Sequence, residues 1–166
     1  MKFKIIPPDK INDNILNECY YVEINSGGEP YKKEDLRSVL SWPSSVTIVA
    51  YDDEKAVGMI TANGESSKLG GSIYIVNASV VQEYHRRGIA TNIFYELFKF
   101  YKRKGINKNV SISVDKDNLP AINMYKKIGF KLVGDYEDEQ QFGMFLSLDE
   151  FGKNCEIILK EREDFK

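Results

Sequence analysis

The residues best suited to chemistry form a short basic turn, Arg86-Arg87-Gly88, between an expected strand over 72–81 and an expected helix that begins at Ile89. Such a turn can bind an anion, because the first N–H groups of a helix are unpaired and its dipole is positive at that end. Gly88 has no Cβ, so the backbone there can approach a phosphate closely. An ordinary strand-to-helix connection with two solvated arginines would have the same sequence pattern, and this stretch alone leaves both interpretations open.

A long amphipathic helix is predicted to follow this turn. Apolar residues recur at Ile89, Ile93, Leu97 and Phe100, and polar or charged residues fall on the opposite face. This spacing is typical of a helix that buries a wide apolar stripe. Three basic residues at the end of the run suit the negative end of the helix dipole, and Gly105 can take the left-handed cap.

Composition restricts the class of protein. The chain has 166 residues, of which 42% are hydrophobic, and this fits a single globular domain over 1–166. The net charge of −2 implies no nucleic-acid partner. Cys19 and Cys155 form no CxxC pair and the chain has one histidine, so no metal site is expected. The N-terminus lacks a signal-peptide apolar region and no stretch approaches membrane-spanning length, so a cytoplasmic protein without membrane attachment is expected.

The other elements are predicted from periodicity and turn residues. Strands are expected over 2–6, 46–51, 56–62, 72–81, 110–114, 130–135 and 141–148, and helices over 11–22, 33–40, 89–104 and 120–128. Asp9 is expected to cap the first helix, 64–71 to form a hairpin loop, and the tail after Asp149 matches no element clearly. Strands 72–81 and 110–114 should be parallel, because a crossover helix joins them, and a ligand is expected at their carboxyl ends.

Two segments resemble the signature motifs of the GCN5-related N-acetyltransferases (GNAT). Residues 80–90, VVQEYHRRGIA, are similar to the acetyl-CoA motif Gln/Arg-x-x-Gly-x-Gly/Ala, which lies between the fourth strand and third helix of that family. Residues 118–130, NLPAINMYKKIGF, resemble the second signature, Asn-x-x-Ala-x-x-x-Tyr-x-x-x-Gly-Phe. The resemblance covers a core of 46–148, leaves 149–166 as a C-terminal extension, and departs from the family at His85, where Gln or Arg is usual.

The resemblance implies a fold and a cosubstrate. The fold is a mixed α/β sheet, mostly antiparallel, with one splayed parallel strand pair and helices on both faces. Acetyl-CoA would lie where those two strands separate, with its pyrophosphate on backbone N–H groups of the basic turn and its pantetheine paired with the end of the strand. The cofactor-binding residues implied are Val80, Val81, His85, Arg86, Arg87, Gly88, Ile89, Ala90, Thr91, Asn118, Ala121 and Tyr125.

The chemistry implied is the direct attack of an amine on a thioester. The resemblance gives the catalytic roles to Val80, whose N–H would stabilise the oxyanion, and to Tyr125, which would protonate the leaving thiolate. No general base is evident, because Asn77 and Ser79 on the strand are not bases at neutral pH. The acidic stretch 137–139 could reach the acceptor pocket, a water chain could carry the proton, or the amine could arrive neutral.

The predicted function is therefore transfer of an acetyl group from acetyl-CoA to a primary amine of a small molecule or peptide. The alternative from another class is a catalytically silent acyl-CoA-binding sensor or interaction module. The resemblance also makes a homodimer through edge strands possible.

Overall fold

The computed structural model describes residues 1–65, 71–135 and 140–164. Its centre is a seven-stranded sheet in the order β1-β2-β3-β4-β5-β7-β6. The strands are β1 (Lys2–Ile6), β2 (Ser45–Asp52), β3 (Lys55–Asn63), β4 (Ile73–Val80), β5 (Asn109–Asp115), β6 (Lys131–Asp135) and β7 (Gln141–Ser147). Neighbouring strands are antiparallel except for the predicted parallel pair β4–β5.

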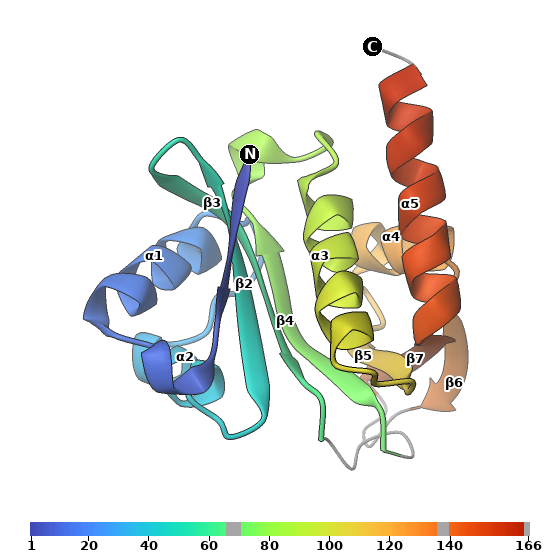
Figure 1. Cartoon of the computed structure of the whole chain (residues 1–166), viewed down its shortest axis with the longest axis horizontal. Helices are drawn as coiled ribbons and strands as arrows, with labels where there is room; N and C mark the ends of the chain where they lie inside the picture. Colours follow the sequence, from blue (N-terminus) through green and yellow to red (C-terminus); the bar gives the residue numbers. More distant parts are fainter. Residues whose placement is uncertain (66–70, 136–139, 165–166) are drawn as a thin grey trace.

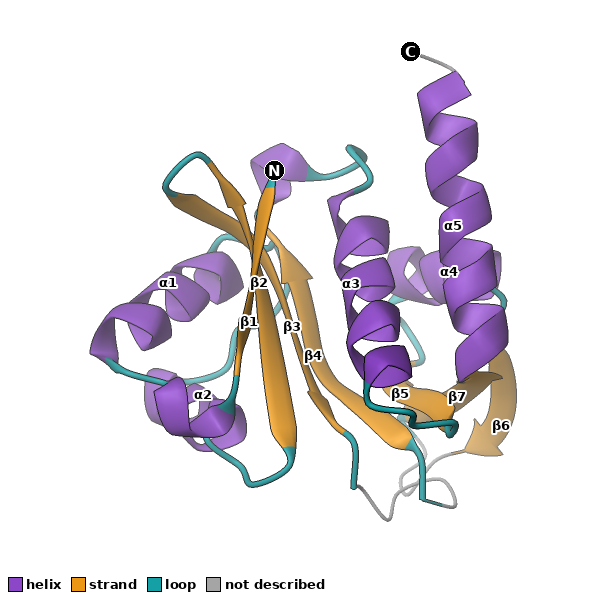
Figure 2. Ribbon diagram, in the orientation of Figure 1, coloured by secondary structure: helices purple, strands orange, loops and turns teal. Residues whose placement is uncertain are grey.

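Helices cover both faces of the sheet (Figures 1 and 2). They are α1 (Asp13–Ile24), α2 (Lys33–Leu40), α3 (Ile89–Arg103), α4 (Leu119–Ile128) and α5 (Leu148–Asp164), with short 3-10 helices at Pro8–Lys10 and Gln82–Tyr84. One apolar core joins α1 and α2 to the sheet, and a larger core joins α3, α4 and α5 to the opposite face. The mixed α/β fold predicted from the sequence is confirmed. None of the described helices is long and apolar enough to span a membrane.

Strands β4 and β5 separate before either strand ends. Their backbone pairing stops at Ile75 and Ile112, although β4 continues to Val80 and β5 to Asp115. Val76 is an extra residue in β4 relative to β3 and forms a β-bulge. Because a bulge bends a strand and increases its twist, β4 turns away from β5 beyond this point, as Figure 1 shows. The resulting gap lies at the carboxyl ends of the parallel pair, where a ligand was expected.

The first helix begins later than predicted. The N-cap of α1 is Asn12, whose Oδ1 accepts a hydrogen bond from the N–H of Ile15 at 2.9 Å, so the prediction that Asp9 caps this helix was wrong. Asp9 lies instead in the 3-10 helix, where Pro8 already fixes a tight turn. The other predicted strands and helices are confirmed with shifts at their ends. The hairpin loop expected over 64–71 falls largely on 66–70, outside the described residues.

The tail without a sequence assignment forms α5, the longest helix. It starts directly after β7 without a loop, and Ser147 caps it, since the N–H of Glu150 donates to Ser147 Oγ at 3.2 Å. Phe151 and Cys155 on its inner face are fully buried, and the Phe151 ring lies 5.7 Å from that of Phe94 on α3. Asn154 Nδ2 donates to the carbonyl of Ile128 at 2.7 Å, which fixes the end of α4 against α5.

This contact predicts unequal effects of two matched glycine substitutions. Gly105 and Gly129 both follow a helix with positive φ, of +72° and +108°. A Cβ at Gly105 would meet nothing within 4 Å, whereas one at Gly129 would lie 2.6 Å from Asn154 Nδ2. We expect Gly105→Ala to lower the free energy of unfolding by about 1–2 kcal/mol through backbone strain. Gly129→Ala should cost about 1–3 kcal/mol more through overpacking. Urea unfolding measures both, and equal losses would contradict the role of Asn154.

Candidate functional site

The turn before α3 presents free backbone donors. Gly88 takes the left-handed conformation, with φ of +80°, and is the N-cap of α3. The N–H of Asn92 donates to the Gly88 carbonyl at 3.0 Å and begins the helical ladder. Within the described part of the chain, the N–H groups from Arg86 through Thr91 have no acceptor. They therefore form the cluster of unpaired amides that an anion requires at a helix N-terminus.

The two arginines of this turn form no ion pair with a carboxylate of the described residues. Arg86 and Arg87 are exposed, and neither lies within ion-pair distance of a carboxylate among the described residues. The guanidinium carbon of Arg87 lies 4.7 Å from the centre of the Tyr84 ring, a cation–π contact that orients it. The imidazole Nε2 of His85 lies 2.7 Å from the carbonyl oxygen of Val80, so this side chain fastens the turn to the end of β4.

Val80, the last residue of β4, and Val81, which follows it, differ in whether their backbone N–H groups are already hydrogen-bonded. The N–H of Val81 donates to Val57 O at 2.9 Å, and its carbonyl accepts from the N–H of Tyr84 at 2.8 Å. In an antiparallel ladder the direction of the backbone groups alternates, so the Val80 N–H points away from β3 and toward the gap beside β5. Both backbone groups of Val81 are thus bonded within the protein, and pairing of Val81 with the pantetheine stays a prediction. The N–H of Val80 has no acceptor among the described residues, whereas its carbonyl lies against His85.

The second motif forms the start of α4 and its buried face. Asn118 is the N-cap, and its Oδ1 accepts from the N–H of Ala121 at 3.3 Å. The oxygen of Asn118 and the N–H of Ala121 thus serve the helix. The amide nitrogen of Asn118 bonds to no other group of the described chain, so it can still donate to a ligand.

Tyr125 lies on the side of α4 that faces the larger core and is 7% exposed. Its ring packs against Phe94 and Phe130, with centroids 6.4 and 5.8 Å away. Burial raises the pKa of Tyr125 to about 12, so the hydroxyl keeps its proton at neutral pH. No described residue accepts a hydrogen bond from this hydroxyl. Tyr125 is consequently a neutral donor without a partner among the described residues.

Glu23, near the end of α1, is a buried carboxylate that the sequence analysis missed. The residue is 3% exposed. Its Oε1 accepts from Asn77 Nδ2 at 2.6 Å and from Ser79 Oγ at 2.7 Å, and its Oε2 accepts from the N–H of Tyr31 at 3.2 Å. No lysine, arginine or histidine of the described residues lies within ion-pair distance. Glu23 is therefore a buried carboxyl group whose hydrogen-bond partners among the described residues are all neutral donors.

Glu23 and Tyr125 lie on opposite faces of the sheet. Ala78 and Val80 of β4 pack into the core of α3 and α4, which also contains Tyr125. Since side chains alternate along a strand, Asn77 and Ser79 point to the other face, where α1 places Glu23. The gap between β4 and β5 thus has a carboxylate on one face and a neutral phenol on the other.

A sequence signal for Glu23 did exist. Leu16, Cys19 and Glu23 follow the spacing i, i+3 and i+7, and all three are buried. A charged residue that continues an apolar stripe is a candidate functional group, because charged residues are rarely buried in full. Its partners on β4 lie more than fifty positions away in sequence, so only the tertiary structure reveals the contact.

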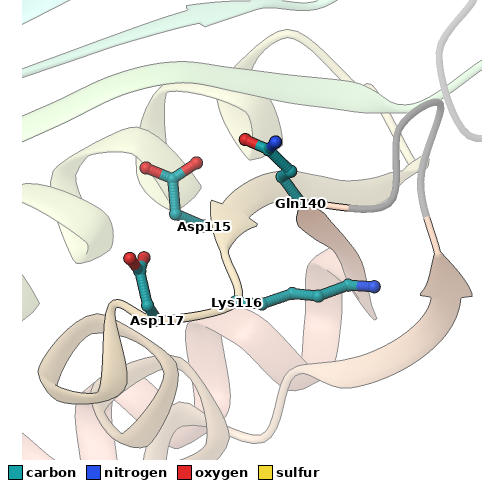
Figure 3. Close-up of a pocket in the computed structure, with 4 residues that line it drawn as sticks. All are labelled: Asp115, Lys116, Asp117 and Gln140. Carbon is teal, nitrogen blue, oxygen red and sulfur yellow. The ribbon is translucent and has the colours of Figure 1, made fainter.

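A polar hollow of about 330 Å³ lies at the carboxyl end of β5. Asp115, Lys116, Asp117 and Gln140 line it (Figure 3). Asp115 Oδ1 also accepts from Gln141 Nε2 at 3.0 Å. The acidic stretch 137–139, which the sequence suggested for the acceptor pocket, lies outside the described residues. Two of the four residues that line this hollow, Asp115 and Asp117, carry carboxylates.

Comparison with known proteins agrees with this geometry. The model of the acetyltransferase (GNAT) family matches residues 12–130. The chain is 26% identical over 117 residues to the "Probable N-acetyltransferase san" of Drosophila melanogaster, covering 70% of this chain and 55% of that protein. It therefore spans about half the length of that curated relative. It is 28% identical over 152 residues to streptothricin acetyltransferase of Escherichia coli, covering 81% of this chain and 83% of that one.

Solved structures share the fold. PaiA N-acetyltransferase from Thermoplasma acidophilum, in complex with coenzyme A, superposes with a TM-score of 0.70 at 21% identity, covering 89% of this chain and 99% of that one. An aminoglycoside 6′-N-acetyltransferase complexed with coenzyme A gives 0.71 at 15% identity, covering 89% and 97%. The family model spans most of the chain and both motifs occupy the expected elements, so the chain belongs to the acetyltransferase (GNAT) family.

Proposed function

We propose that this protein transfers the acetyl group of acetyl-CoA to a primary amine of a small molecule or peptide. The observation that carries the choice of an amine is Glu23, a buried carboxylate without a cationic partner among the described residues. A buried charge is costly unless an opposite charge compensates it. A primary amine arrives at neutral pH as an ammonium ion and would supply that charge.

The cosubstrate would bind on the opposite side of the gap. The unpaired N–H groups from Arg86 to Thr91 would hold the diphosphate, with Gly88 permitting close approach and the two arginines of the turn adding charge. The backbone of Val80 would direct the thioester into the gap. Two solved structures of the same fold are complexes with coenzyme A, which supports acetyl-CoA as the cosubstrate.

Glu23 would also prepare the amine for attack. An ammonium ion has no lone pair, so one proton must leave before the nitrogen can attack the thioester carbonyl. Ser79 Oγ donates to Glu23 Oε1, and this hydroxyl can pass a proton from the amine to the carboxylate. Glu23, acting through the Ser79 hydroxyl, would therefore be the general base, a role that neither Asn77 nor Ser79 can fill by itself.

The remaining steps would use Val80 and Tyr125. The N–H of Val80 would stabilise the oxyanion of the tetrahedral intermediate, and collapse would release the thiolate of CoA. Tyr125 would give that thiolate its proton. With the pKa of Tyr125 raised to about 12 and a thiol reference pKa of about 8.5, this transfer is uphill by roughly 5 kcal/mol. The same apolar surroundings raise the pKa of the thiol and so reduce the difference.

The family resemblance leaves the amine open between two kinds. Streptothricin acetyltransferase is named for a small molecule, and N-alpha-acetyltransferase 30 of Schizosaccharomyces pombe, 30% identical over 106 residues, for an α-amine. Thiol release from acetyl-CoA, measured with a panel of small polyamines and peptides with free N-termini, tests the proposal. Tight CoA binding without turnover of any amine would instead indicate an acyl-CoA sensor.

Removing the Tyr125 hydroxyl should lower turnover. We expect Tyr125→Phe to reduce kcat by about 100-fold or more, with little change in KM for acetyl-CoA, because the thiolate loses its acid but the ring remains. Tyr101→Phe is the matched control, since that hydroxyl is also buried and has no partner in the described structure. Steady-state kinetics of both variants test this prediction. An unaltered kcat for Tyr125→Phe would exclude Tyr125 as the acid that protonates the thiolate.

Neutralising Glu23 should produce a defect that depends on pH. Near pH 7 we expect Glu23→Gln to lower kcat/KM for the amine by about 100-fold, because the ammonium loses both its counter-charge and its proton acceptor. The defect should shrink as pH approaches the pKa of the amine, about 8 for a peptide N-terminus and about 10 for an alkyl amine, since neutral amine then arrives from solution.

The control for this variant is Glu18→Gln on the same helix, which also removes one half-buried carboxylate, here hydrogen-bonded to the Tyr51 hydroxyl of β2. It should behave as wild type at every pH. A Glu23→Gln defect of constant size from pH 7 to pH 10 would show that Glu23 only maintains the local structure.

A further inference from the structure

The last turn of α5 contacts the turn that precedes α3. Arg162 Nη1 donates to the carbonyl oxygen of Arg86 at 3.2 Å. A Cβ at Gly88 would lie 2.9 Å from Arg162 Cδ and 3.0 Å from Nε, so the arginine stem rests directly on the glycine. In Figure 1 α5 runs beside α3 and its C-terminal part extends to the end where α3 begins. The C-terminal helix therefore delivers a side chain to the candidate diphosphate site.

Arg162 adds a third positive charge where no negative charge balances it. Of the described carboxylates, none lies within ion-pair distance of Arg86, Arg87 or Arg162. Lys160, two residues earlier on α5, behaves differently, because its Nζ pairs with Glu156 Oε1 at 3.0 Å. Three guanidinium groups beside the positive end of a helix repel one another and the helix dipole. An anion at this point would remove that repulsion.

We propose that Arg162 is a phosphate ligand of acetyl-CoA, so that the C-terminal helix forms part of the cosubstrate site. The proposal rests on the function proposed above, in which the turn before α3 binds the diphosphate. Only one of the five guanidinium donors is used by Arg86 O, and the others can reach phosphate oxygens. A planar guanidinium matches a phosphate through paired hydrogen bonds, which a lysine cannot reproduce.

This arrangement gives Gly88 a second function. The space that a side chain at this position would fill is occupied by the Arg162 stem. A larger residue at 88 would displace Arg162 as well as strain the turn, whose φ is +80°.

Calorimetric titration of the full-length protein with CoA tests the proposal. We expect Arg162→Ala to raise the Kd for CoA about tenfold or more and Arg162→Lys to raise it less, because charge-assisted hydrogen bonds are lost in full or in part. Lys160→Ala is the matched control and should stay within about twofold of wild type. In steady-state kinetics, Arg162→Ala should raise KM for acetyl-CoA and leave kcat unchanged.

Dephospho-CoA identifies which phosphate is bound. If the defect of Arg162→Ala persists with this ligand, Arg162 binds the diphosphate, and if the defect disappears, it binds the 3′-phosphate. Either result supports the proposal. A Kd for Arg162→Ala equal to or lower than that of wild type, in a variant with the wild-type melting temperature, would overturn it. A wild-type protein that binds no CoA would overturn the proposed function as well, so the two failures can be told apart.

Discussion

The early end of hydrogen bonding between β4 and β5 is the constraint on which the site depends. Beyond Ile75 the two parallel strands carry backbone groups that no neighbouring strand satisfies. Such groups require a partner, from water or from a ligand, because an unpaired buried amide is costly. The bulge at Val76 creates this opening by bending β4 while β3 stays paired with it. Strand β4 thus stays paired with β3 along its length, while its side facing β5 beyond Ile75 has room for an extended ligand.

The opening also separates two chemical environments. On one face, α1 buries the Glu23 carboxylate among neutral hydrogen-bond donors. On the other face, aromatic rings surround the neutral hydroxyl of Tyr125 and raise its pKa. A proton acceptor and a proton donor on opposite sides of one gap suit a reaction that takes a proton from the entering nitrogen and gives one to the leaving sulfur.

Helix α5 links the stability of the fold to the site. Its inner face completes the larger core through Phe151 and Cys155, and Asn154 holds the end of α4, the helix that carries Tyr125. Its last turn reaches the turn before α3 through Arg162. A segment outside both sequence motifs therefore contacts the elements that carry each of them.

The sequence alone determined the strands, the helices α2 to α4 and the position of the candidate anion-binding turn before α3. These follow from local rules: periodicity, capping residues, and the unpaired amides at a helix N-terminus. The resemblance to the family, and not these rules, gave Tyr125 and Val80 their candidate roles. Local rules misplaced the cap of α1, because Asp9 and Asn12 are both capping residues and lie close together in the sequence.

Only the tertiary structure decided which distant groups meet. Glu23 is a candidate base because α1 packs against β4 and places it beside Ser79. Arg162 contacts the turn before α3 because α5 packs along α3. The availability of backbone groups was decided in the same way, because the Val81 N–H pairs with β3 whereas the Val80 N–H has no acceptor among the described residues. Sequence patterns act over a few residues, whereas these contacts depend on how the bulged sheet and its helices pack, and that packing sets which charges are left without a partner.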